Sequence, residues 1–229
     1  ITQEVLYSHL TGQKVIGIYP LLATDQCRLL AVDFDKSDWK NCVTAFSEAC
    51  LSLNIPFLVE RSRSGNGAHV WIFFSEPIAA KQARLMGAGI LDKAMELYPA
   101  LDFESYDRMF PNQDHMPAGG FGNLIALPLQ KHARALGNST FIDSNFNAFT
   151  DPWTVLQQTE LMSSSEVNNI VNELGYNFIE QNQTDVDHEA PWVKNIPKKN
   201  QKIAGCPDAI ELVFANMIHI PIQTLPSQL

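Results

Sequence analysis

The chain has 229 residues, with 16 Lys and Arg against 25 Asp and Glu, which gives a formal net charge of −9 at pH 7. Its 45% hydrophobic and 18% charged residues are typical of a globular protein with a substantial core, and exclude wholesale disorder. No run of about 18 apolar residues is present, which argues against a membrane span, and the first ten residues do not resemble a secretory signal. The chain begins with Ile1 rather than Met, so we expect a domain taken from a longer protein.

The acidic balance disfavours a protein that binds a nucleic-acid backbone by charge alone, because such binding depends on clustered Lys and Arg. It fits a protein that gathers carboxylates to hold cations. The four cysteines form no C-x-x-C pair: Cys27, Cys42, Cys50 and Cys206. Cys42 and Cys50 fall in a helix-like stretch, where we expect buried free thiols, and this favours a reducing, cytoplasmic location.

Strands and helices alternate through the first half of the chain. Period-two runs of apolar residues predict strands, and apolar residues at helical spacing, such as Trp39, Val43 and Phe46, predict helices. In chain order we expect strands over 14–19 and 28–35, a helix capped by Ser37 and ending near Leu53, strands over 56–60 and 68–74, and a helix from Pro77 to Tyr98.

Shorter elements follow in the second half. We expect strands over 123–127 and 140–143, then helices over 153–161, 165–174 and 208–217, with the polar segment 176–206 as a linker. The pattern is α+β. It predicts a catalytic core over residues 1–150 and a helical C-terminal extension over 151–229.

Two carboxylates stand together at the end of the second predicted strand. By the period of two, Asp33 and Asp35 share one face, while Val32 and Phe34 share the other. An Asp pair at a strand end is often only a turn or a helix cap. Here the apolar strand would hold two repelling charges side by side, which favours a site for Mg²⁺ or Mn²⁺.

A glycine-rich loop joins the next two predicted strands. It runs from Arg61 through Arg63 and Ser64-Gly65-Asn66-Gly67 to His69. Backbone N–H groups in such a loop can approach a phosphate, and His69 between hydroxyl and arginine side chains favours a phosphate-binding group. A polar hairpin turn at Asn66-Gly67 is the alternative.

A third carboxylate lies in the segment from Ser105 to Asp114. The apolar neighbours of Asp107 predict a short half-buried strand, so Asp107 can complete a metal site. Asp114 is the competing candidate, and it follows Pro111 in a predicted loop.

These three motifs in this order resemble the archaeo-eukaryotic primase superfamily. The D-x-D motif is matched by Asp33 and Asp35, the expanded S-x-H motif by Ser64 to His69, and the third motif by Tyr106-Asp107. The stretches IYPLLATDQCRLLAVDFD and ERSRSGNGAHVWIFF are similar to the primase-polymerase domain of bacterial TOTE conflict systems and CRISPR-associated relatives. The resemblance covers about residues 10–145 and implies a primase fold, with an RRM-like antiparallel sheet, flanking helices and an N-terminal αβ unit.

The resemblance implies template-directed primer synthesis and extension from NTPs or dNTPs. Asp33, Asp35 and Asp107 would hold two Mg²⁺ or Mn²⁺ ions, and the loop with His69 would grip the triphosphate. Further expected nucleotide contacts are Arg61, Arg63, Lys131 and Tyr19, and expected template contacts are Arg108, Asn112, Gln113 and Arg134. The expected partners are a single-stranded DNA template, a primer, nucleoside triphosphates and a fused or associated helicase, with no membrane partner.

Three other functions remain open from the residues alone. A small sheet with exposed aromatic side chains can bind single strands without catalysis. A sugar-nucleotide transferase also uses D-x-D, although it leaves the loop before His69 unexplained. A metal-dependent nuclease has less support, because no Glu-x-Lys follows the acidic strand at a useful distance.

Overall fold

A five-stranded antiparallel sheet forms the centre of the structure, a computed structural model that describes residues 2–176. The strand order is β5-β2-β4-β3-β7, so the two longest strands lie in the interior of the sheet. The strands are β2 (Gln26–Phe34), β3 (Leu58–Arg61), β4 (Ala68–Ala79), β5 (Tyr106–Phe110) and β7 (Thr140–Ile142).

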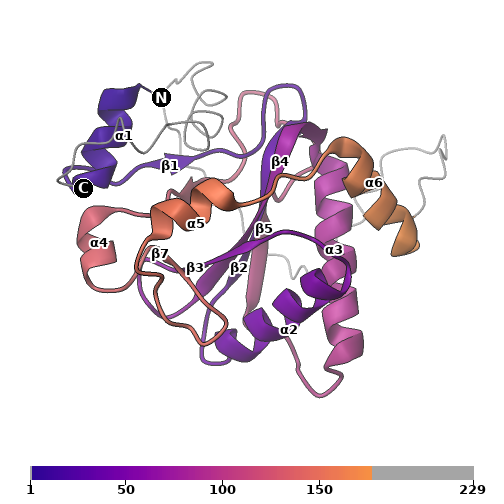
Figure 1. The fold of residues 1–229 in the computed structure, drawn as a ribbon. Helices are drawn as coiled ribbons and strands as arrows, with labels where there is room; N and C mark the ends of the chain where they lie inside the picture. The colour runs from indigo at the N-terminus through magenta and orange to yellow at the C-terminus, as the bar shows by residue number, and fades with distance from the viewer. Residues whose placement is uncertain (1, 177–229) are drawn as a thin grey trace.

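Three helices cover one face of this sheet (Figure 1): α2 (Trp39–Ser52), α3 (Ala80–Leu97) and α6 (Ser164–Glu173). Alternate strand residues such as Leu30, Val32 and Val70 point into this layer and are fully buried. The larger of the two hydrophobic cores therefore lies between the sheet and these helices.

A second layer covers part of the opposite face. It contains α1 (Gln3–Leu10), the paired strands β1 (Gly17–Ile18) and β6 (Ile125–Ala126), and α5 (Pro152–Gln158), while α4 (Lys131–Ala135) precedes β7. Leu29, Ala31 and Trp71 supply the sheet side of this core. The next residues on the same face are Asp33 on β2 and His69 on β4, so the face changes from apolar to polar along both strands.

A buried histidine attaches α1 to this second layer. The ring of His9 is fully buried, with Nε2 3.0 Å from the carbonyl oxygen of Pro128, while its Nδ1 accepts the amide of Ile16 at 3.1 Å. Burial lowers the pKa of His9, with the nearby carbonyl groups opposing that shift. His9 is therefore a structural residue.

The predicted α+β class and antiparallel sheet are confirmed, and most predicted elements lie within a few residues of their expected bounds. The helix expected to begin at Pro77 begins at Ala80, because β4 continues to Ala79, which pairs with Gln26. Asp38 rather than Ser37 precedes α2. The short helices α1 and α4 were missed.

The predicted C-terminal helices over 153–161 and 165–174 correspond to α5 and α6, which pack on the two cores. The helix expected over 208–217 and the linker after residue 176 lie outside the described residues. Within residues 2–176, no helix combines the length and the apolar character needed to cross a membrane.

Candidate active site

A row of polar side chains crosses four strands at the open end of the partly covered face. The antiparallel register aligns Arg108 of β5 with Asp33 of β2, Asp33 with His69 of β4, and His69 with Glu60 of β3. Directly opposed residues in a sheet project from the same face, so these four side chains are neighbours.

Asp35 comes directly after β2 and extends this row. Its amide donates to the carbonyl oxygen of Ser105 at 2.7 Å, which fixes the backbone as it leaves the sheet. Its Oδ1 atom is buried and has no hydrogen-bond partner among the described residues. A buried carboxylate oxygen in that state is costly, and a bound cation would satisfy it.

Asp107 reaches the row through a β-bulge. Asp33 pairs with Arg108 and Phe34 pairs with Tyr106, so Asp107 is the extra residue of β5 with no counterpart on β2. A bulge re-aims the side chain of its extra residue, and bulges are frequent beside active sites. Asp107 Oδ2 accepts from Arg108 Nε at 2.6 Å.

The charges of the row are electrostatically coupled. Burial raises the pKa of Asp33, and the charges of Asp107 and Asp35 raise it further, while His69 and Arg108 oppose the shift. The pKa of Arg108 is raised by its hydrogen bond to Asp107 and by the charges of Asp33 and Asp35. The structure therefore brings Asp33, Asp35 and Asp107 within electrostatic reach of one another.

His69 lies between two carboxylates. Its Nδ1 donates to Glu60 Oε2 at 3.0 Å, and its Nε2 is 3.4 Å from Asp33 Oδ1. Burial disfavours the charged ring, but the hydrogen bond and charge of Glu60, with the charge of Asp33, outweigh it and raise the pKa of His69. Glu60 and Asp33 therefore stabilise the positively charged form of His69 at the centre of the row.

The glycine-rich loop over residues 62–67 packs against the end of β2. A Cβ atom on Gly67 would lie 2.5 Å from the carbonyl oxygen of Phe34 and 3.2 Å from Asp35 Cα, so only glycine allows this approach. Gly65 has a φ of +81°, and its Cα faces the side-chain amide of Asn138. The loop is therefore held beside the carboxylates from two sides.

A comparison with known families agrees with this geometry. Residues 1–170 match the family described as the TOTE conflict system, Archaeo-Eukaryotic Primase domain. The chain belongs to this family. A search of curated proteins finds no match. Membership places the chain among primase-polymerase-like nucleotidyltransferases.

Other expected site residues of this primase domain lie away from the row. Arg61 pairs with Ala68, whose side chain belongs to the helix-covered core, and its guanidinium donates to the carbonyl oxygen of Phe146. Arg134 lies on α4 with its guanidinium 5.2 Å from the ring centre of Trp153. Each of these two arginines therefore has a packing role in the structure.

The remaining residues expected to contact nucleotide or template also lie outside the row. Tyr19 packs on Phe121, with ring centres 5.4 Å apart. Asn112 and Gln113 follow β5 on the far side of Phe110 from the Asp33 position. Two other expected contacts are exposed, in the loop and at the first residue of α4: Arg63 and Lys131.

The loop itself uses part of its hydrogen-bonding capacity internally. The amide of Gly65 donates to the carbonyl oxygen of Ser62 at 3.0 Å, and the amide of Asn66 donates to Ser64 Oγ at 3.2 Å. Ser64 Oγ also lies 3.1 Å from Ser62 Oγ. A phosphate held by these amides would have to replace these internal bonds.

Of the two candidates for a third carboxylate, the register favours Asp107. Asp114 forms an ion pair with Arg84 of α3, on the helix that covers the other face of the sheet. Asp107 lies on β5 beside Asp33. The structure therefore separates the two residues by location.

Glu60 is a site residue that the sequence motifs missed. It is 2% exposed and accepts from His69 Nδ1, from Trp71 Nε1 at 2.9 Å, and from Ser139 Oγ at 3.4 Å. The sequence could have predicted this contact, because the hairpin register that pairs Arg61 with Ala68 also places Glu60 opposite His69.

The carboxylates provide a suitable donor set for divalent cations. Asp33, Asp35 and Asp107 offer oxygen ligands, and the buried Oδ1 of Asp35 lacks a partner among residues 2–176. Burial, with the charges of Asp107 and Asp35, raises the pKa of Asp33. Within the same range, no three His, Cys, Asp or Glu side chains already stand close enough to share one ion. Cation binding by Asp107 would compete with its bond to Arg108.

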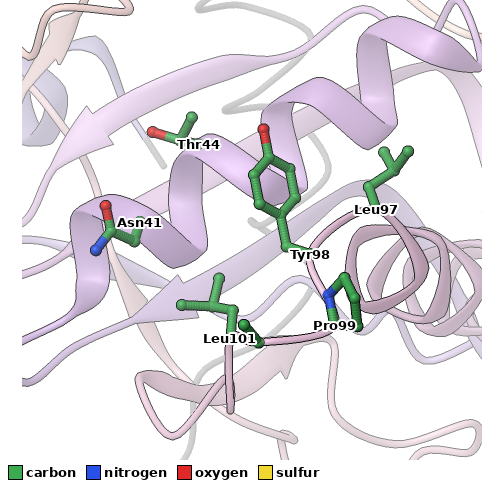
Figure 2. Close-up of a pocket in the computed structure, with 7 residues that line it drawn as sticks. Asn41, Thr44, Leu97, Tyr98, Pro99 and Leu101 are labelled. Atoms are coloured by element: carbon green, nitrogen blue, oxygen red, sulfur yellow. The ribbon is translucent and has the colours of Figure 1, made fainter.

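A cavity of about 400 Å³ lies elsewhere (Figure 2), between α2 and the end of α3. Its lining includes Asn41, Thr44, Tyr98 and Leu101, and the hydroxyl of Tyr98 donates to Glu48. These elements cover the opposite face of the sheet, so the cavity is not part of the carboxylate row.

Gly67→Ala tests the contact between the loop and β2. The new methyl group would overlap backbone atoms that cannot rotate away, so we expect the free energy of unfolding to fall by about 1–3 kcal/mol. Urea denaturation measures it. The neighbouring Asn66→Ala, at an exposed side chain, should stay within about 0.5 kcal/mol of the parent. A Gly67→Ala variant as stable as the parent would contradict the close approach.

Asp33→Asn tests the cost of burying a charged Asp33 beside the other carboxylates of the row. Because the folded protein raises the pKa of Asp33, its charged form destabilises the fold, and this penalty develops as pH rises above 3.8, the ordinary value. We expect Asp33→Asn to unfold at higher urea than the parent at pH 7 in chelator, with the difference vanishing near pH 3.

Asp151→Asn is the control of opposite sign. Hydrogen bonds from Thr154 lower the pKa of the exposed Asp151, so its charged form stabilises the cap of α5 and its loss should not increase stability. An Asp33→Asn variant less stable than the parent at pH 7 would contradict a destabilising charge on Asp33.

Proposed function

We propose that this domain is a template-directed primase-polymerase, which joins nucleoside triphosphates to a 3′-hydroxyl and also begins new strands. The observation that carries the proposal is the meeting of Asp33, Asp35 and the bulged Asp107 with His69 at one end of the sheet. Family membership supports nucleotidyl transfer as the reaction class.

In the proposed reaction the 3′-oxygen of the primer attacks the α-phosphorus of the incoming nucleotide. The new P–O bond forms as the bond to the bridging oxygen breaks, pyrophosphate leaves, and the hydroxyl proton passes to solvent water. Two Mg²⁺ or Mn²⁺ ions held by Asp33, Asp35 and Asp107 would lower the pKa of the hydroxyl and neutralise the triphosphate.

The side chains of the row have separate tasks in this reaction. Asp33, Asp35 and Asp107 supply negative charge to a substrate that arrives as a metal complex. His69 donates from Nε2 to a phosphate oxygen, because its Nδ1 is already bonded to Glu60. Gly67 of the loop lies against Asp35, so Ser64 and the loop amides would contact phosphates bound there.

The proposed partners are a single-stranded DNA template, a primer and nucleoside triphosphates, with a helicase supplied by the same or another chain. Arg108, beside the carboxylates, is a candidate contact for the nucleotide or template once its bond to Asp107 is exchanged. The acidic net charge predicts modest, salt-sensitive DNA affinity for this domain alone.

The double variant Asp33→Asn with Asp35→Asn tests the proposal. Loss of the cation ligands should remove several kcal/mol of transition-state stabilisation, so incorporation should fall by about 10³-fold while the fold is retained. Labelled product is sized with template, Mg²⁺ or Mn²⁺ and each nucleotide pool, both with and without primer.

Asp114→Asn is the matched control, because Asp114 is a carboxylate in an ion pair away from the row. It should extend primers at the parental rate. Extension by the double variant at the parental rate would refute the assignment. Binding of single strands by the parent without any incorporation would instead favour a non-catalytic binding module.

A further inference from the structure

Glu60 is a buried carboxylate on the same sheet face as Asp33 and His69, and it belongs to none of the three sequence motifs. It lies on β3 with 2% exposure, in a position where an unpaired charge would be strongly unfavourable. Its two oxygens have three donors. Oε2 accepts from His69 Nδ1 at 3.0 Å and Trp71 Nε1 at 2.9 Å, and Oε1 accepts from Ser139 Oγ at 3.4 Å.

Two of these donors hold the carboxylate in place. Trp71 is fully buried in the second core, and its ring stacks on Phe73 with centres 6.2 Å apart. Ser139 is also buried, and its amide donates to the carbonyl oxygen of Arg61, so it is anchored to the same strand as Glu60. Glu60 therefore has two anchored neighbours besides His69, and the bond from Trp71 is the shorter of the two.

The third donor, His69, is the side chain that would contact the substrate. A carboxylate only accepts hydrogen bonds, so the contact with Glu60 requires that Nδ1 of His69 carries a proton and faces β3. This fixes the ring plane. Nε2 then faces the opposite way, toward Asp33 Oδ1 at 3.4 Å and the open end of the face.

We propose that Glu60 is a positioning residue of the nucleotidyl-transfer site, which holds the His69 ring so that Nε2 faces the triphosphate beside Asp33. The inference rests on the proposed function, because it assigns His69 to the substrate. Without Glu60 the ring can rotate about its side-chain torsions and turn Nε2 away from the carboxylates. Partners that orient a functional histidine in this way typically change affinity or activity by about 10–100-fold.

A purely structural role for Glu60 predicts a different result. If Glu60 served only to satisfy Trp71 and Ser139, its replacement would lower stability without a specific effect on nucleotide use. Glu60→Gln separates hydrogen bonding from charge, because a glutamine oxygen can accept from both His69 and Trp71 while its amide faces Ser139. Ser139→Ala is the matched control, since it touches the same carboxylate but not the histidine.

The experiment combines steady-state kinetics with proton NMR of the folded domain. We expect Glu60→Ala to raise the KM for the incoming nucleotide by about 10–100-fold with a smaller change in kcat. The double variant with His69→Ala should be no worse than His69→Ala alone, because both changes remove one interaction. Ser139→Ala should stay close to the parental KM, and Glu60→Gln, which keeps the hydrogen bond to His69 but removes the negative charge, should raise KM less than Glu60→Ala.

The NMR measurement needs neither nucleotide nor activity. The parent should show a downfield Nδ1–H resonance of His69 protected from solvent, which Glu60→Gln keeps and which both Glu60→Ala and His69→Ala lose. If Glu60→Ala does not fold, Glu60→Asp replaces it, because its shorter side chain withdraws the carboxylate from Nδ1.

Additive effects of Glu60→Ala and His69→Ala on KM, or a parental KM in Glu60→Ala, would overturn the inference. A Glu60→Gln variant as impaired as Glu60→Ala would also overturn it, since orientation by hydrogen bonding would then not be the cause. A parent that extends no primer but shows the Glu60-dependent resonance would refute the proposed function and leave the Glu60–His69 contact standing.

Discussion

The alignment of four antiparallel strands is the constraint on which the site depends. Arg108, Asp33, His69 and Glu60 are neighbours only because β5, β2, β4 and β3 pair in one register. A slip of one residue would turn His69 into the helix-covered core and bring Val70 into the row. The apolar residues that fix the register, such as Val32 and Ile72, therefore determine the chemistry at the end of the sheet.

One face of the sheet contributes to the second hydrophobic core along part of its length and carries the charged row at its end. Leu29, Ala31 and Trp71 bury one part of it under the second layer, and the next positions carry charge. Burial, together with the charges of Asp107 and Asp35, raises the pKa of Asp33, so its charged form is destabilising, and His69 and Arg108 offset this in part. Such local opposition between stability and function is common at active sites. It also explains why a net charge of −9 says little about the partners of the domain.

Much of this arrangement could be predicted from local pattern. The alternation in β2 correctly assigns Asp33 to the polar face and Phe34 to the core, and apolar spacing correctly predicts α2 and α3. The short helices α1 and α4 were missed because each depends on tertiary contacts more than on its own pattern, as the bond between His9 and Pro128 illustrates for α1.

The rest of the site depends on register, which no single segment encodes. The β-bulge interrupts the alternation of side chains along β5 at Asp107. Cross-strand pairing places Glu60 beside His69. Arg61 is the converse case. Its place in the same motif as His69 suggests a phosphate ligand. Because side chains alternate along β3, however, Arg61 points to the other face and donates to the carbonyl oxygen of Phe146.

The central claim is that the end of β2, the glycine-rich loop and the β5 bulge form one metal–nucleotide site. Paramagnetic broadening by Mn²⁺ with a nucleoside triphosphate tests it most directly, because the effect falls steeply with distance from the ion. We expect selective loss of the amide signals of Asp33, Asp35, Gly67 and Asp107, with those of Leu97 and Tyr98 at the distant cavity unchanged. Broadening centred elsewhere, or unchanged by Asp33→Asn with Asp35→Asn, would contradict the account.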